Sequence, residues 1–194
     1  MNLAILGYGS IARQHMRALG ALRERGEEPA LGFEWVMGRV AASAAEFATE
    51  FGVRRSTTDL ATVLDDARVD AVLITSPTDL HADQTERALP AGKHVLCEIP
   101  LATSLADVDR LIALADQVDR RLMVCHTERF YPALVEAKRL IDSGELRPYS
   151  IVSRYMFQRR QNVNWVGRQR SWTDNLLWHH GCQVVFTWSE NDRG

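Results

Sequence analysis

Two glycines close to the N-terminus stand where a strand-like run gives way to a helix-like one. Residues 2–6 are apolar after Asn2, Gly7 and Gly9 follow, and Ala12 lies three residues further on. Gly7 permits a tight turn, Gly9 lets the backbone approach a pyrophosphate, and Ala12 keeps the helix close to the strand. Unpaired N–H groups at the start of that helix attract the anion. The spacing predicts a dinucleotide-binding turn, although an ordinary strand-to-helix turn shares these glycines.

The residues after the second strand-like run decide which dinucleotide is expected. NAD-binding sites usually have an acidic side chain there, bonded to the ribose hydroxyls, but this run ends in Met37, Gly38 and Arg39. Glu34 lies too early in the strand for that role. A small residue followed by an arginine leaves room for a 2′-phosphate and supplies a partner for it. We predict NADP, with NAD as the alternative if Arg39 is only a solvated residue at a helix start.

A second chemical signal is a block of positive charge in a chain whose net charge is −2. Residues 146–173 include no acidic residue and six arginines, at positions 147, 154, 159, 160, 168 and 170. Guanidinium groups pair with carboxylates through two parallel hydrogen bonds. The block predicts a small substrate that carries several carboxylates, with Arg129 and Arg160 nearest to it. A solvated face is the alternative.

Two adjacent histidines, His179 and His180, are the candidate general bases. A histidine titrates near neutral pH, so it could take a hydroxyl proton while hydride passes to a nicotinamide. On a helix these neighbours would point about 100° apart and would not share one role, and either could instead be structural. Trp172 and Trp178 could wall a planar ring, although large aromatic side chains also pack in cores.

These groups need a scaffold, and strand and helix signals alternate along most of the chain. Strands are predicted at residues 2–6, 31–37, 70–75, 94–98 and 122–125. Helices are predicted after Gly9 and at residues 40–51, 59–67 (capped by Asp59), 78–92 (capped by Thr78 or Asp79) and 104–119. Parallel strands joined by such helices form a doubly wound sheet. The predicted fold class is therefore α/β, with a Rossmann-type domain over residues 1–126.

The remainder, residues 127–194, is expected to be an incomplete α/β C-terminal domain, because only one strand (residues 149–157) and one further helix (residues 175–188) are legible.

Composition narrows the class further. The net charge argues against nucleic acid as a partner, and no apolar run approaches the ~20 residues of a membrane span. Three scattered cysteines, at positions 97, 125 and 182, lack metal-ligand spacing. We therefore expect a cytoplasmic protein without a metal site.

Four motifs in order resemble those of the Gfo/Idh/MocA oxidoreductases. They are Gly7-Tyr8-Gly9, Thr75-x-Pro77 with His81, Gly92-Lys93-His94-Val95, and Glu98-x-Pro100. The resemblance covers nearly the whole chain and implies NAD(P)-dependent oxidation or reduction of a carbinol carbon, between a Rossmann domain and a second α/β domain. The predicted cofactor-binding residues are Gly7, Tyr8, Gly9, Ser10, Ile11, Ala12, Arg39, Thr75, Ser76, Pro77, Thr78, His81, Glu98 and Ile99.

One position departs from the family pattern. Most members have a lysine where this chain has Ile99, and isoleucine can neither donate nor accept a proton. Ile99 and the sequences at residues 125–130, 159–162 and 171–180 together resemble those of one branch of the family, the 4-carboxy-2-hydroxymuconate semialdehyde dehydrogenases. That resemblance implies NADP-dependent oxidation of the hemiacetal of 4-carboxy-2-hydroxymuconate 6-semialdehyde to 2-pyrone-4,6-dicarboxylate, in aromatic (protocatechuate and lignin) degradation.

The last residues also depart from the family. Its motif continues with a histidine and an aspartate where this chain has Gln183 and Phe186. Family members normally extend well past this point, so a C-terminal truncation is expected. Three functions stay open: the hemiacetal dehydrogenase or a fragment of it, a sugar or inositol dehydrogenase of the same family, and a truncated non-catalytic NADP-binding module. A homo-oligomer is open as well.

Overall fold

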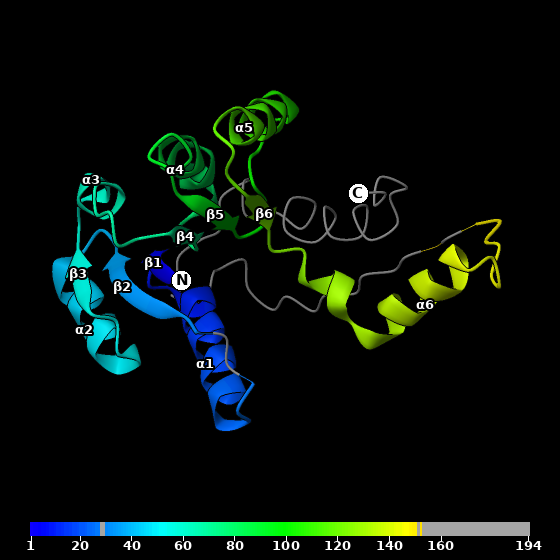
Figure 1. The fold of residues 1–194 in the computed structure, drawn as a ribbon, viewed down its shortest axis with the longest axis horizontal. Coiled ribbons are helices and arrows are strands. Elements are labelled where there is room, and N and C mark those ends of the chain that lie inside the picture. The colour runs from blue at the N-terminus through cyan, green and yellow to red at the C-terminus, as the bar shows by residue number, and fades with distance from the viewer. Residues whose placement is uncertain (28–29, 151, 153–194) are drawn as a thin grey trace, which may run out of the picture. The chain divides into compact units, whose positions relative to one another are not determined.

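The computed structural model describes residues 1–27, 30–150 and 152 of the chain, and Figure 1 traces their path. The chain divides into two compact units, Met1–Val124 and Cys125–Gly194. Six of the nine residues in the strand predicted over 149–157 fall outside the described residues, and the helix over 175–188 falls entirely outside them. So do five of the predicted site residues, Arg160, Trp172, Trp178, His179 and His180.

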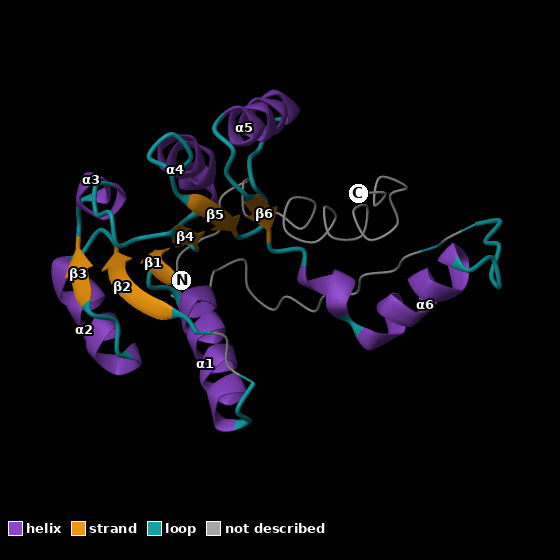
Figure 2. Ribbon diagram, in the orientation of Figure 1, coloured by secondary structure: helices purple, strands orange, loops and turns teal. Residues whose placement is uncertain are grey.

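The N-terminal unit alternates strands with helices along its whole length (Figure 2). Its strands are β1 (Asn2–Leu6), β2 (Gly32–Met37), β3 (Arg55–Thr57), β4 (Ala71–Ile74), β5 (His94–Cys97) and β6 (Leu122–Val124). Its α-helices are α1 (Ser10–Glu24), α2 (Ala41–Phe51), α3 (Leu60–Leu64), α4 (His81–Ala88) and α5 (Leu105–Gln117). A 3₁₀ turn, η1 (Thr78–Leu80), precedes α4.

All six strands are parallel and lie in the order β3-β2-β1-β4-β5-β6. The order reverses at β1: β2 and β3 lie on one side of it, and β4, β5 and β6 lie on the other. In register, Leu6 at the end of β1 lies between Met37 of β2 and Ile74 of β4. This arrangement confirms the predicted doubly wound α/β sheet of the Rossmann type.

Helices cover both faces of this sheet, with α3, α4 and α5 on one face and α1 and α2 on the other (Figure 2). Alternate side chains of β1 supply both cores. Ala4 and Leu6 belong to the first cluster, and Ile5 to the second. Successive side chains of a strand point to opposite faces, so a strand buried on both faces is apolar throughout. This explains the unbroken apolar runs of β1 and β4.

Three predicted boundaries were wrong. The helix expected over 59–67 ends at Leu64, because the Asp66 carboxylate accepts a hydrogen bond from the Arg68 N–H (3.0 Å) and holds a turn there. The helix expected over 78–92 ends at Ala88, two residues before Pro90, which cannot continue a helix. The cap expected from Thr78 or Asp79 does not form: the chain tightens into η1, and α4 starts without a side-chain cap.

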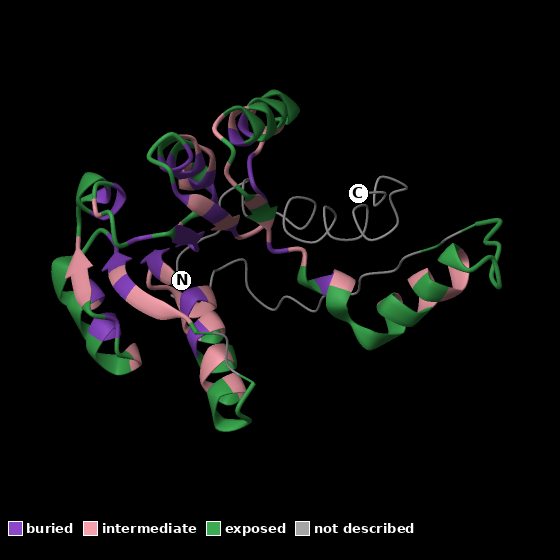
Figure 3. Cartoon of the chain, in the orientation of Figure 1, coloured by how far each residue is buried: buried purple, intermediate pink, exposed green. Residues whose placement is uncertain are grey.

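The described part of the second unit contains a 3₁₀ turn, η2 (Thr127–Phe130), and the helix α6 (Pro132–Asp142). Pro132 occupies the first turn of α6, where its missing N–H costs nothing. No residue of α6 is buried, and Figure 3 colours the helix only as intermediate and exposed. Within the described residues, no helix has the length and apolar character needed to span a membrane.

Candidate functional site

The carboxyl ends of β1, β2, β4 and β5 meet at one edge of the sheet in the N-terminal unit. Parallel sheets bind ligands in the crevice outside these ends, at the strand where the order reverses. Here that strand is β1, and the loops after β1 and β4 flank the crevice. Except for Arg129, the predicted site residues that the structure describes follow these four strands directly. The topology therefore brings together residues that are up to 92 positions apart, from Gly7 to Ile99.

The turn after β1 depends on Gly7. Its φ angle is +110°, in the region that side-chain-bearing residues rarely adopt. A Cβ atom at Gly7 would lie 2.7 Å from the Thr75 carbonyl oxygen and 2.8 Å from the Ser76 nitrogen. The Thr75 N–H also donates to the Leu6 carbonyl (2.8 Å). The two crevice loops therefore pack backbone against backbone, and only glycine fits at this contact.

Helix α1 begins directly after this turn, with Gly9 as its N-cap. Gly9 has φ −74° and ψ −170°, an extended conformation open to any residue. It brings no side chain to cap the helix, and the first turn carries no acidic residue. The N–H groups of Ser10, Ile11 and Ala12 are thus available to an anion at the positive end of the helix. Ala12 is fully buried beneath the turn.

The end of β2 carries the residues predicted to select the coenzyme. Tyr8 reaches across from the β1 turn, and its hydroxyl accepts a hydrogen bond from the Val40 N–H (3.2 Å). Gly38 lies beneath the Tyr8 ring. Arg39 is exposed, and among the described residues none forms a hydrogen bond or ion pair with it. Glu34 lies within β2, is only 4% exposed and forms an ion pair with Arg54 (3.4 Å). It is therefore not placed to bond ribose hydroxyls at the end of the strand.

The loop after β4 is fixed mainly by its own side chains. The Thr75 hydroxyl donates to the Leu6 carbonyl (3.1 Å), and the Ser76 hydroxyl donates to Gln84 (2.6 Å). His81 is 2% exposed, and its two ring nitrogens lie 2.7 Å from the Pro100 carbonyl and 2.9 Å from the Ser76 carbonyl. His81 therefore ties the loops after β4 and β5 together. Pro77 is exposed and Thr78 is buried.

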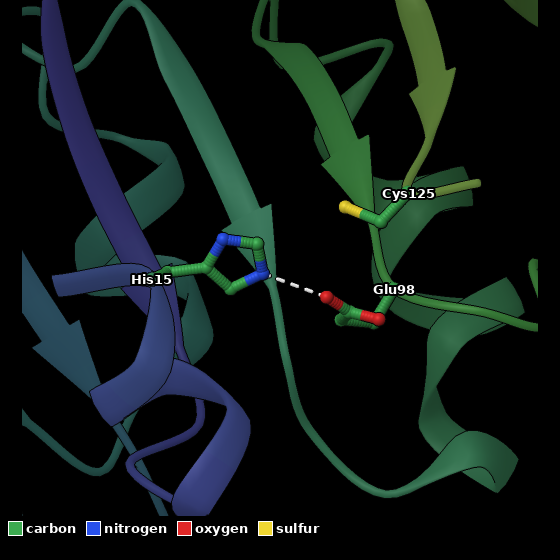
Figure 4. Close-up of side chains that lie close together, drawn as sticks. All are labelled: His15, Glu98 and Cys125. Carbon is green, nitrogen blue, oxygen red and sulfur yellow. Dashed lines mark hydrogen bonds and ion pairs between the residues drawn. The ribbon is translucent and has the colours of Figure 1, made fainter. Parts of the chain in front are cut away.

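The loop after β5 carries Glu98 and Ile99. Figure 4 shows the Glu98 carboxylate pointing toward the His15 ring of α1, and His15 Nε2 lies 2.6 Å from Glu98 Oε1. The Glu98 side chain is only 12% exposed and the His15 side chain only 24%. The other Glu98 oxygen accepts from the Ile99 N–H (3.3 Å). Helix α1 is thus joined to the loop that holds Ile99, the residue that stands where the family usually has lysine.

His15 was missed in the sequence, where Glu98 was selected without a partner. One signal was present: His15 lies three residues after buried Ala12 and one before buried Met16, on the sheet-facing side of α1. A polar side chain on such a face needs a hydrogen-bond partner. Its partner is 83 residues away in sequence, so only the fold could identify it.

Cys97 directly precedes Glu98 at the end of β5, and it is not available as a nucleophile. Its side chain is fully buried, and this burial raises the pKa of the thiol to about 12. The thiol donates a hydrogen bond to the Glu98 carbonyl (3.3 Å). A thiol held protonated is chemically inert at neutral pH.

In the second unit, Arg129 lies in η2 and is half-buried. It lines a groove of about 690 Å³ along α6. The same groove includes Lys138, which pairs with Asp142 (3.2 Å), and Arg139, which pairs with Glu136 (2.9 Å). The pairing of Arg129 with a substrate carboxylate stays a prediction, as do the roles of the residues outside the described part.

Comparison with known proteins identifies the class. Residues 1–126 match the model of the Gfo/Idh/MocA oxidoreductase family, described as an NAD-binding Rossmann fold. Residues 132–193 match the model of the C-terminal region of bacterial oxidoreductases. The chain therefore belongs to the Gfo/Idh/MocA oxidoreductase family, and the predicted family resemblance is confirmed.

Individual relatives in this family act on different substrates. The chain is 37% identical, over 95% of its length, to 4-carboxy-2-hydroxymuconate-6-semialdehyde dehydrogenase of Sphingobium sp.. It is 33% identical, over 75% of its length, to inositol 2-dehydrogenase of Salmonella typhimurium. These matches cover 57% and 43% of the two relatives, so the chain spans about half the length of the curated proteins it matches.

Solved structures of the same kind bind either coenzyme. The chain is similar to a 3-ketoreductase from Actinomadura kijaniata in complex with NADP (TM-score 0.65, 30% identity), with 74% of this chain and 42% of that one covered. It is also similar to scyllo-inositol dehydrogenase from Lactobacillus casei with bound NAD(H) (TM-score 0.66, 25% identity), with 75% and 42% covered. The fold therefore fits a nicotinamide dinucleotide, and proteins that share it bind either NADP or NAD(H).

Proposed function

We propose that this chain is an NADP-dependent dehydrogenase, or the major part of one, that oxidises the hemiacetal of 4-carboxy-2-hydroxymuconate 6-semialdehyde to 2-pyrone-4,6-dicarboxylate. The observation that carries the proposal is the length over which the chain is similar in sequence to the semialdehyde dehydrogenase. The match to the semialdehyde dehydrogenase extends over 95% of the chain, against 75% for the inositol dehydrogenase. A match over 95% necessarily includes most of the arginine-rich block at residues 146–173.

The residues of the N-terminal unit fit NADP. The first turn of α1 offers N–H groups that no side chain caps, as a pyrophosphate site requires. Gly38 leaves the end of β2 without a side chain, and the Arg39 guanidinium is unengaged among the described residues. A guanidinium is well suited to a phosphate because it donates two parallel hydrogen bonds. The bound coenzyme would supply a nicotinamide that accepts hydride.

The proposed substrate carries carboxylates, which the arginine block would hold. Arg129 and Arg160 are the residues that we propose lie nearest to them, with Trp172 and Trp178 against the ring of the substrate. Because Ile99 stands where the family usually has lysine, the hydroxyl proton must leave through another group. We propose His179, with His180 as the alternative, as that general base.

Turnover by the full chain tests the proposal. The ring-cleavage product of protocatechuate is supplied with NADP or NAD, and formation of reduced coenzyme is followed by its absorbance, with the pyrone product confirmed by mass spectrometry. We expect reduction of NADP that depends on the semialdehyde. Myo-inositol and scyllo-inositol run in parallel, and turnover of either one in place of the semialdehyde would overturn the proposed substrate.

Coenzyme binding, measured separately by NADPH fluorescence, distinguishes the remaining outcomes. Binding without turnover of any substrate would favour the non-catalytic NADP-binding module. A chain that binds neither coenzyme would contradict the proposal at its first step. His179→Ala and His180→Ala, assayed in the same way, identify the base: the variant that loses turnover but keeps NADPH affinity carries the proton transfer.

A further inference from the structure

At the end of β2, the Tyr8 ring fills the space that a side chain at position 38 would need. A Cβ atom built on Gly38 would lie 1.9 Å from Tyr8 Cε1 and 2.2 Å from Tyr8 Cδ1. These separations are far shorter than any van der Waals contact, so no side chain fits at position 38 while the ring stays in place. Gly38 is itself buried. The absence of an acidic residue after β2 is therefore coupled to the presence of Tyr8.

The Tyr8 ring is fixed at both ends. It packs against the buried cluster that α1 and α2 form with Ile5 and Val36. Its hydroxyl accepts the Val40 N–H (3.2 Å), at the residue that caps α2. Swinging the ring away would expose apolar surface and leave that N–H without its partner. The ring is thus a structural part of the crevice.

Within the described residues, the Tyr8 hydroxyl donates its proton to no acceptor. A phenol can accept and donate at the same time, and its bond to Val40 uses only the acceptor side. Arg39 lies between Gly38 and Val40, the two residues that Tyr8 contacts. The 11-residue helix α2 starts just beyond, with no side-chain cap and no acidic residue in its first turn. The Tyr8 hydroxyl therefore lies beside the N-terminus of α2, and Arg39 is the residue between the two that Tyr8 contacts.

We propose that Tyr8 determines coenzyme specificity in two ways: its hydroxyl donates to the 2′-phosphate of NADP, and its ring excludes an acidic side chain at position 38. The proposal rests on the NADP-dependent function proposed above. It predicts that the preference for NADP depends on Tyr8 as well as on Arg39. It also predicts that an aspartate at position 38, the usual partner of the ribose diol of NAD, has no room while Tyr8 is present.

Dissociation constants for NADPH and NADH, measured by fluorescence on the full chain, test the first part. Tyr8→Phe keeps the ring and removes only the hydroxyl. We expect it to weaken NADPH by about 10-fold, as for loss of a hydrogen bond to a charged group, and to leave NADH affinity unchanged. Tyr131→Phe, an exposed tyrosine in the second unit, is the matched control and should change neither. Equal effects of Tyr8→Phe on both coenzymes, or no effect, would overturn the phosphate contact.

The second part is tested with an aspartate at position 38. Gly38→Asp alone is expected to weaken both coenzymes and to lower the unfolding midpoint. The double variant Tyr8→Ala/Gly38→Asp should regain stability and bind NADH at least about 10-fold more tightly than Gly38→Asp does. A gain in NADH affinity from Gly38→Asp alone would overturn the exclusion. A wild-type chain that binds neither coenzyme would instead contradict the proposed function, so the two failures are distinguishable.

Discussion

At the scale of single residues, the crevice is held by contacts that tolerate little change. Gly7 lies against the backbone of Thr75 and Ser76. His15 of α1 forms a hydrogen bond with Glu98 in the loop after β5. Tyr8 covers Gly38. Each contact joins a different pair of loops or elements around the predicted coenzyme site. Changes at these residues should therefore affect both stability and coenzyme binding.

Gly7→Ala should destabilise the N-terminal unit by about 2 kcal/mol or more, because it adds both a strained φ and a clash with backbone atoms. It should also abolish NADPH binding. Gly20→Ala is the matched control: Gly20 lies inside α1 with no atom within 4 Å of an added Cβ. That change should stabilise the helix by about 0.5–1 kcal/mol. Similar effects of the two substitutions in urea unfolding would contradict the tight turn.

The His15–Glu98 contact should appear as a coupling energy in a double-mutant cycle. The partners are 2.6 Å apart and mostly buried. We expect the effects of His15→Ala and Glu98→Ala on the free energy of unfolding to be non-additive by about 1 kcal/mol. Additivity of the two effects in urea denaturation would show that the side chains do not interact in solution.

Cys97 should resist alkylation in the folded chain. Burial raises the pKa of its thiol to about 12, so almost no thiolate is present at pH values near the ordinary thiol pKa of about 8.5. Iodoacetamide followed by peptide mapping should find Cys97 unmodified in buffer and modified in urea. Because the fold keeps this thiol protonated, its contribution to stability should fall as the pH rises above about 8.5. Rapid modification of Cys97 in buffer would contradict its burial.

At the scale of elements, short helices depend on their caps. Asp59 caps α3 by accepting from the N–H groups of Ala61 (3.0 Å) and Thr62 (3.2 Å). The Thr62 hydroxyl, followed by the Ala61 N–H, lowers the pKa of the Asp59 carboxyl. A lowered pKa means that the ionised form favours the fold above the ordinary pKa of about 3.9, and that this stabilisation is lost as the pH falls.

Asp59→Ala should therefore lower the urea midpoint at neutral pH, and the difference from wild type should shrink as the pH falls below about 4. Asp59→Asn is the control, because asparagine is also a good cap but does not titrate. Its midpoint should stay close to that of wild type at neutral pH. A difference between wild type and Asp59→Ala that is constant with pH would argue against the cap.

Most elements of the first unit could be predicted from the sequence, because their signals are local. The apolar runs gave five of the six strands to within one or two residues, and Asp59 and Ser104 correctly marked the starts of α3 and α5. β3 was missed because Arg55–Thr57 is short, polar and at the sheet edge. Its strand conformation comes from pairing with β2, which no local pattern records.

The site was predictable in part, for the same physical reason. The glycine turn, Arg39 and Glu98 stand at strand ends, so sequence order alone places them at the crevice. Contacts between side chains from different elements could not be foreseen. His15 with Glu98 and Tyr8 with Gly38 depend on the strand order and on rotamers that packing selects.

At the scale of the whole molecule, the N-terminal unit contains a complete doubly wound sheet, and the predicted substrate groups belong to the second unit. The chain should consequently bind its coenzyme through residues 1–124 and discriminate among substrates through residues 125–194. Replacement of Arg160 by Ala should reduce turnover of the carboxylated hemiacetal while leaving NADPH affinity unchanged. Steady-state kinetics and fluorescence titration of the same preparation check this, and loss of both properties together would contradict the division of roles.

If the crevice after β2 binds a 2′-phosphate, as proposed, the ratio of NADPH to NADH affinity must depend on the residues there. Wild type should bind NADPH at least about 10-fold more tightly than NADH, in line with charge-assisted hydrogen bonds to phosphate. Arg39→Asp should remove most of that preference, whereas Arg17→Asp, the same charge change on the exposed side of α1, should retain it. Equal affinity of wild type for the two coenzymes, or an equal loss of both in Arg39→Asp, would contradict 2′-phosphate binding in this crevice.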